Sequence, residues 1–186
     1  GDDQKQHLEL CRDIAQKFNN DYKFENFFIV PEPLIKKEFS RIMSLKDGLK
    51  KMSKSEISDL SRINLTDDKD QITNKIKKAK TDTLPLPSTI EELEKRPEAE
   101  NLIGIYSSLT NKTLQKSIDE FAGKNFSEFK EKLSDIVVNE INPISLKIKE
   151  LLDDKDFLEK ILKDGYEKAN EIASKKIKKI QEIVGF

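Results

Sequence analysis

The chain has 186 residues, and 34 Lys and Arg nearly balance 35 Asp and Glu, which leaves a formal net charge of −1. This balance excludes a uniformly basic protein of the histone type, although local basic stretches remain possible. Charged residues make up 37% of the chain and hydrophobic residues 35%, so we expect a folded protein of one domain or somewhat more. A single cysteine excludes a disulfide framework, and no apolar run reaches the about 20 residues of a membrane span.

The first third of the chain combines one helix with two short apolar runs. Apolar residues recur at helical spacing over residues 4–18, and Cys11 lies on this stripe, where we expect a small core residue. The runs at 27–30 and 42–45 predict two short buried strands, whose pairing partners we expect to lie outside this chain. Residues 46–55 are rich in lysine and are typical of an exposed loop.

From residue 66 onward the pattern is helical, which predicts a mainly α chain. Ser88 and Glu91 match a capping box, in which each side chain bonds a backbone amide of the other residue. Pro97 suits the first turn of the next helix, and Gly123 suits the end of a later one. Pro143 is expected to kink or restart a long helix, because proline removes an internal hydrogen bond. The change in character near Leu65 predicts a domain boundary there.

The most specific motif is five residues long. Residues 51–55 read Lys-Met-Ser-Lys-Ser, which is identical to the KMSKS loop of class I aminoacyl-tRNA synthetases. By itself so short a match leaves open a solvated loop of lysine and serine. About fifty residues upstream, however, Gly1-Asp2-Asp3-Gln4 opens a helix and resembles the GxDQ segment that the tryptophanyl and tyrosyl enzymes share.

Further segments resemble the bacterial tryptophanyl-tRNA synthetases in particular. They are Arg-Asp-Ile-Ala at 12–15, Val-Pro-Glu-Pro at 30–33, Arg-Ile-Met-Ser-Leu at 41–45 and the late stretch 164–169. The resemblance runs over the whole chain and identifies it as a C-terminal portion of such an enzyme. The HIGH-type motif of class I synthetases does not occur in these 186 residues. We therefore expect this chain not to activate tryptophan by itself.

The resemblance implies a catalytic role for Lys51, Ser53 and Lys54. In tryptophan activation the carboxylate of the amino acid attacks the α-phosphate of ATP and expels pyrophosphate, so negative charge builds up on phosphate oxygens. Two ammonium groups on one loop, with a hydroxyl donor between them, would stabilise that charge. Gly48, just upstream, is expected to give the loop a flexible point about which it closes over ATP.

The resemblance also implies a nucleotide site and a substrate site. The ATP-binding residues would be Gly1, Asp2, Asp3, Ile42, Lys51, Met52, Ser53, Lys54 and Ser55. Within this set, Asp3 would accept a hydrogen bond from a ribose hydroxyl, and Ile42 and Met52 would offer backbone groups to the adenine. Gln4 would face the polar end of tryptophan.

A domain organisation and a set of partners follow from the same resemblance. Residues 1–65 would be the last piece of a Rossmann-like catalytic domain, and residues 66–186 a helical bundle that binds the anticodon end of tRNA(Trp). The enzyme would be a cytoplasmic, homodimeric tryptophan–tRNA ligase that uses ATP with Mg²⁺ and holds no zinc or other metal of its own.

Two other functions stay open at this point. A tyrosyl-type synthetase is disfavoured by the His-Leu-Glu-Leu sequence that follows the GxDQ-like segment and by the Pro-Glu-Pro turn. A non-catalytic helical interaction module would have no reason to bind nucleotide near Lys51. Single residues have simpler interpretations too: His7 is expected to orient other groups, because the attacking carboxylate is already ionised. The basic run Lys75, Lys77, Lys78 and Lys80 predicts a solvated helix face, with contact to tRNA phosphates as the alternative.

Overall fold

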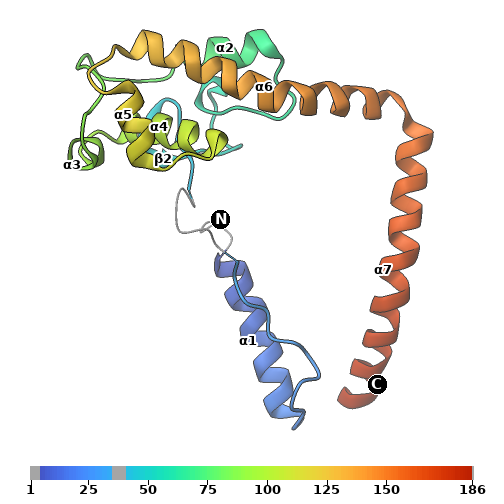
Figure 1. Cartoon of the computed structure of the whole chain (residues 1–186). Helices are drawn as coiled ribbons and strands as arrows, with labels where there is room; N and C mark the ends of the chain where they lie inside the picture. The colour runs from blue at the N-terminus through green and yellow to red at the C-terminus, as the bar shows by residue number, and fades with distance from the viewer. Residues whose placement is uncertain (1–4, 35–40, 186) are drawn as a thin grey trace. The chain divides into compact units, whose positions relative to one another are not determined.

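The computed structural model describes residues 5–34 and 41–185 (Figure 1). Most of these residues lie in helices, which confirms the predicted class. They form two compact units, one of residues 5–34 with 150–185 and the other of residues 41–149. The boundary expected near Leu65 falls inside the second unit, because residues on both sides of that position share one core.

In the first unit, helix α1 (Lys5–Asp21) holds the extended segment that follows it through one buried side chain. Asn19 Nδ2 donates to the carbonyl of Phe28 at 2.9 Å, and Asn19 Oδ1 accepts from the Phe28 amide at 3.0 Å. The prediction of a buried strand at 27–30 is wrong, since the structure assigns no strand there and Ile29 is 88% exposed. A side-chain amide, rather than a neighbouring strand, satisfies the backbone of Phe28.

An expectation about an apolar stripe also fails in this unit, because Cys11, expected in a core, is exposed on α1. Helix α7 (Lys155–Val184) runs without a break through Gly165, and none of its described residues is buried. Helical periodicity specifies which side chains share a face, but it does not supply the surface that covers them.

The second unit contains a hairpin, a short 3₁₀ turn and most of the helices. Its elements are β1 (Met43–Ser44), β2 (Asp47–Lys51), η2 (Asp59–Ser61), α2 (Lys69–Lys77), α3 (Ile90–Glu94), α4 (Pro97–Thr110), α5 (Leu114–Phe121) and α6 (Phe126–Asp153), which continues past this unit. Tyr106, Phe121 and Phe129 meet at the centre, with the Phe121 ring 4.9 Å from each of the other two between centroids. One continuous apolar core results.

The hairpin corrects two predictions about residues 42–55. Strand β1 pairs antiparallel with β2, with Met43 opposite Lys51, so the run at 42–45 finds its partner within the chain. Residues 47–51 are therefore a strand, and only the remainder of the predicted exposed loop is free of regular structure. Asn101 of α4 fixes β1 from the other side, because its side chain both donates to and accepts from the backbone of Met43 at 2.9 Å.

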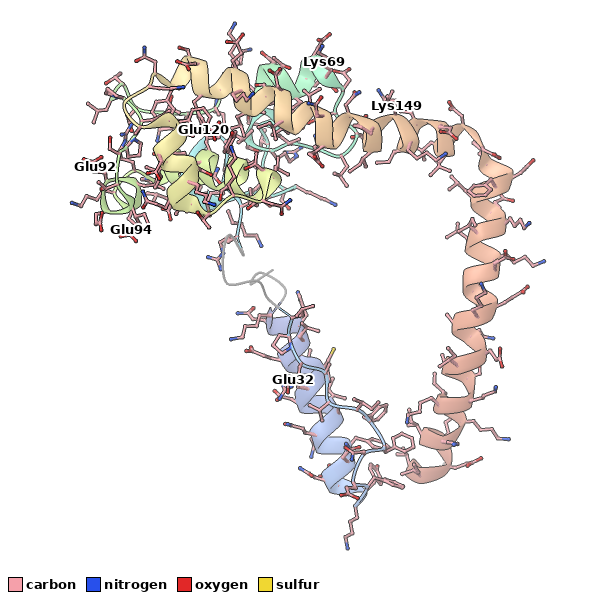
Figure 2. The ribbon with its side chains drawn as sticks, in the orientation of Figure 1. Glu32, Lys69, Glu92, Glu94, Glu120 and Lys149 are labelled. Carbon is pink, nitrogen blue, oxygen red and sulfur yellow. The ribbon has the colours of Figure 1, made fainter. Side chains whose placement is uncertain are left out.

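Most helix ends in this unit follow the sequence signals. Pro97 is the first residue of α4, and Gly123 follows α5 with a positive φ of 72°, as predicted. The capping residue of α3 is Thr89 rather than Ser88: its hydroxyl accepts from the Glu92 amide at 3.2 Å. Pro143 lies inside α6 without ending it. Charged side chains extend from the surface of several elements, among them Lys69, Glu92, Glu94 and Glu120 (Figure 2).

Candidate active-site loop

The KMSKS segment leaves the hairpin directly. Strand β2 ends at Lys51, and the Met52 amide donates to the carbonyl of Ile42 at 3.0 Å, which extends the pairing by one residue. The structure thus brings together Ile42 and Met52, the two residues expected to offer backbone groups to adenine. Since the Met52 amide and the Ile42 carbonyl are bonded to each other, any adenine contact would use their other backbone groups.

The tip of the loop is a tight serine turn. Ser53 Oγ accepts from the Ser55 amide at 3.2 Å, and the Ser53 carbonyl accepts from the Glu56 amide at 3.5 Å. The Ser53 hydroxyl keeps its own proton, which it can donate to an incoming oxygen. Lys51, Lys54 and Ser55 are exposed, whereas Ser53 is half-buried. The loop therefore presents two cations to solvent on either side of one hydroxyl.

Met52 anchors this loop to the protein interior. Its side chain is half-buried and packs against the core of the second unit. This contact of the single apolar residue of the motif ties the loop to the core between the two exposed lysines.

Gly48 holds β2 against the start of α4. It is buried, and a Cβ atom built on it would come within 2.6 Å of the backbone of Pro97 and Glu98. The side chain of Glu98 is itself mostly buried, 18% exposed, at this contact. Gly48 is therefore a close-packing residue in this structure, and the flexible point suggested by the sequence is not found there.

Lys80 completes this attachment. Its Nζ lies 2.7 Å from Glu98 Oε1, and its backbone amide donates to the carbonyl of Leu45 at 2.7 Å. The hydrogen bond from Lys80 holds the pKa of Glu98 below its usual range, although partial burial opposes the shift. Glu98 is thus ionised at neutral pH and binds the strand before the loop to the residues after α2.

The basic run is not the uniform solvated face that the sequence predicted. Lys77 and Lys78 are exposed, but Lys75 is only 3% exposed, and Lys80 is paired as described. The sequence did contain the signal: Ile72, Lys75, Ile76 and Ala79 are spaced as one helix face, and the three apolar members of this set are buried. Composition alone argues against a buried position for Lys75, because lysine is rarely buried.

Four of the predicted site residues, Gly1, Asp2, Asp3 and Gln4, lie outside the described residues. His7 is exposed on α1. Within residues 5–34 and 41–185, no three His, Cys, Asp or Glu side chains are arranged to hold a metal ion. No helix in the same part of the chain is long and apolar enough to cross a membrane.

Comparison with known proteins gives one consistent family. The model of the family described as tRNA synthetases class I (W and Y) matches residues 1–142. Proteins named tryptophan–tRNA ligase from Caulobacter vibrioides and Rickettsia felis are 50% and 52% identical to the chain over all of its 186 residues. The chain spans about half the length of these curated relatives, 54% and 56% respectively.

Solved structures agree with the sequence relatives. A crystal structure of tryptophanyl-tRNA synthetase from Mycoplasma pneumoniae superposes with a TM-score of 0.81 and 28% identity, covering 100% of this chain and 55% of that one. The corresponding enzyme from Campylobacter jejuni, in complex with ADP and tryptophan, gives a TM-score of 0.67 and 29% identity, covering 100% of this chain and 56% of that one.

Proposed function

The chain belongs to the class I tRNA synthetases of the tryptophan and tyrosine type, and we propose that it carries the KMSKS loop and the helical domain of a tryptophan–tRNA ligase. The identity of about 50% to proteins of that name supports tryptophan over tyrosine as the amino acid. Because the chain spans about half of those relatives, we assign the activity to an enzyme that contains this segment rather than to the segment alone.

The observation that carries the proposal is the pair of exposed lysines on a loop whose base is packed into the core. In the first step the tryptophan carboxylate attacks the α-phosphorus of ATP, the bond to the bridging oxygen breaks, and pyrophosphate leaves. Lys51 and Lys54 would stabilise the charge on the departing phosphates, and the Ser53 hydroxyl would donate to one of their oxygens. In the second step a ribose hydroxyl of tRNA attacks the activated carbonyl and releases AMP.

The remaining nucleotide contacts are part of the same proposal. Gly1, Asp2, Asp3 and Ser55 would contribute to ATP binding, and Gln4 would contact tryptophan. Mg²⁺ would arrive with ATP, held by its phosphates. The ADP and tryptophan in the Campylobacter jejuni structure support both substrates.

The organisation around the loop also remains proposed. Residues 1–65 would complete a Rossmann-like catalytic domain, and residues 66–186 would bind the anticodon end of tRNA(Trp); the two parts would share the apolar core of the second unit. Lys77 and Lys78 are the exposed members of the basic run and are the ones available to phosphate. The enzyme would act as a homodimer in the cytoplasm.

Tryptophan-dependent exchange of pyrophosphate into ATP tests this function in an enzyme that contains the segment. Lys54→Ala and Lys51→Ala should each lower the exchange rate by about two to three powers of ten, because each removes an ammonium group that acts mainly in the transition state. Tryptophan affinity should change far less. Lys69→Ala, an exposed lysine at the start of α2, is the matched control.

Three outcomes would contradict the proposal. Exchange that depends on tyrosine would assign the other amino acid of the family. An unchanged rate in both loop variants would remove the loop from the mechanism. Absence of any amino-acid-dependent exchange in the complete protein would favour a non-catalytic module.

A further inference from the structure

The backbone that leaves the KMSKS loop is tied to α2 by three charged side chains. Lys75 Nζ lies 2.6 Å from Asp59 Oδ2 and 2.6 Å from Asp67 Oδ2. Lys75 and Asp67 are buried, with side chains 3% and 5% exposed, whereas the Asp59 side chain is 55% exposed. We refer to Asp59, Asp67 and Lys75 as the ion cluster. Through Asp59, which lies four residues after Ser55, the ion cluster joins the backbone that leaves the loop to α2.

Asp59 is the member of the cluster that reaches the loop. It also accepts from Asn64 Nδ2 at 3.0 Å and pairs with Arg62 Nη2 at 3.1 Å. Arg62 in turn donates from Nη1 to the carbonyl of Glu56 at 2.9 Å, directly after the motif. A chain of short polar contacts therefore runs from Lys75 through Asp59 and Arg62 to the last turn of the loop.

Charge balance alone does not explain this arrangement. An unpaired buried ammonium group is costly, but Asp67, which is buried beside Lys75, already neutralises it. Asp59 is more than half exposed and could remain in water without penalty. Its contact with Lys75 fixes the position of η2 (Asp59–Ser61), and hence of the loop, relative to α2.

The same basic run fixes the other side of the loop. Lys80, five residues after Lys75, binds Glu98, against whose backbone Gly48 packs in the strand before the loop. The Lys80 amide also donates to the carbonyl of Leu45. Lys75 and Lys80 thus hold the backbone on both sides of residues 51–55, and the serine turn spans the gap between the two attachments. A loop that is held at both ends allows its side chains a narrower range of positions than a loop that is held at one end.

We propose that Lys75, acting through Asp59, is a positioning residue for the KMSKS loop and sets where Lys54 meets the phosphates of ATP. The expected effect on pyrophosphate exchange rests on the proposed function. The contacts that link α2 to the loop do not depend on it. Displacement of a catalytic group by about 1 Å can lower a rate by about a hundredfold, so a loosened loop should be visible in activity.

The test uses Asp59→Ala in the complete enzyme, because this change frees the loop while Lys75 keeps Asp67. We expect the maximal rate of tryptophan-dependent pyrophosphate exchange to fall by about tenfold, while the dissociation constant for tryptophan changes by less than about twofold. Hydrogen exchange of the amides at 53–58 should become faster. The control is Asp70→Ala, which removes an exposed carboxylate from the first turn of α2. It should change neither the rate of pyrophosphate exchange nor the exchange of the amides at 53–58.

A second variant tests whether Lys75 acts through Asp59. Lys75→Met should slow pyrophosphate exchange at least as much as Asp59→Ala, and the double variant should be no slower than Lys75→Met alone. Additive losses of the pyrophosphate-exchange rate in the double variant would overturn the proposal. It would also be overturned if Asp59→Ala and Asp70→Ala had equal pyrophosphate-exchange rates and equal amide protection at 53–58. If Lys75→Met does not fold, the comparison of Asp59→Ala with Asp70→Ala decides. If the unmodified enzyme shows no tryptophan-dependent exchange, the proposed function fails, and amide exchange at 53–58 still tests the link.

Discussion

The two compact units use the same kind of helix in different ways. In the second unit, the apolar faces of α2, α4, α5 and α6 meet in one core, with Tyr106 and Phe129 almost fully buried. In the first unit, α1 buries only Ala15 and Asn19 among its described residues, and α7 buries none. Ile172 and Tyr166 on α7 are 74% and 66% exposed.

This difference separates helix formation from helix packing. Both units carry apolar residues at helical spacing, and both form helices where that spacing predicts them. Among the described residues, the helices of the second unit bury far more apolar side chains than those of the first, and they gain the burial that makes short helices stable. The KMSKS loop is attached to this second, well-packed unit, which agrees with the proposal that the loop places two charges on the phosphates of ATP.

The largest expected effect comes from deleting a ring at the centre of the packed unit. Phe129→Ala should lower the free energy of unfolding of that unit by about 4 kcal/mol, because the ring is fully buried and contacts both Phe121 and Tyr106. Ile172→Ala on α7 should change stability by less than about 0.5 kcal/mol. Hydrogen exchange of helix amides reports each unit separately. Similar losses for both substitutions would show that α7 is packed as tightly as the core.

A smaller effect is expected from adding a methyl group in each unit. Gly48→Ala should destabilise the packed unit by about 3 kcal/mol, because the new Cβ meets the backbone of Pro97 and Glu98, which cannot move aside as a side chain can. Gly165→Ala should instead stabilise α7 by about 0.5–1 kcal/mol, since its site is open and alanine favours helix. Amide exchange during thermal unfolding measures the stability change of each substitution in its own unit. If Gly48→Ala left stability unchanged, Gly48 would not be a close-packing residue, and the flexible point predicted from the sequence would be favoured.

The features that the sequence predicted well are the local ones. Pro97 and Gly123 mark helix ends through the backbone angles that they allow, and these angles depend on no distant residue. The KMSKS motif is also local: its last three residues form a turn within the loop that the sequence predicted, although Lys51 belongs to β2. Lys75 was within reach as well, because its spacing from Ile72 and Ile76 placed it on the buried face.

The features that the sequence did not reveal depend on contacts between distant segments. Asn101 bonds to Met43 across 58 positions, and Gly48 packs against Pro97 across about fifty. The run at 27–30 has the composition of a buried strand, yet Asn19 takes the bonds that a strand partner would have made. In each case a single polar or small residue makes the contact, and hydrophobic periodicity does not predict such a contact.

The smallest expected effect compares one buried polar side chain from each unit. Ser61 is fully buried, but its Oγ has no hydrogen-bond partner among the described residues, while its backbone carbonyl accepts from Leu45 at 2.8 Å. Ser61→Ala should therefore leave the stability of the packed unit unchanged or raise it by up to about 1 kcal/mol, because the change removes a desolvated hydroxyl and keeps the backbone bond. Asn19→Ala should have the opposite sign in the first unit, since it leaves both backbone groups of Phe28 without their partner. Amide exchange at Leu45 and at Phe28 measures the two effects, and a destabilising Ser61→Ala would show that the hydroxyl finds a partner in solution.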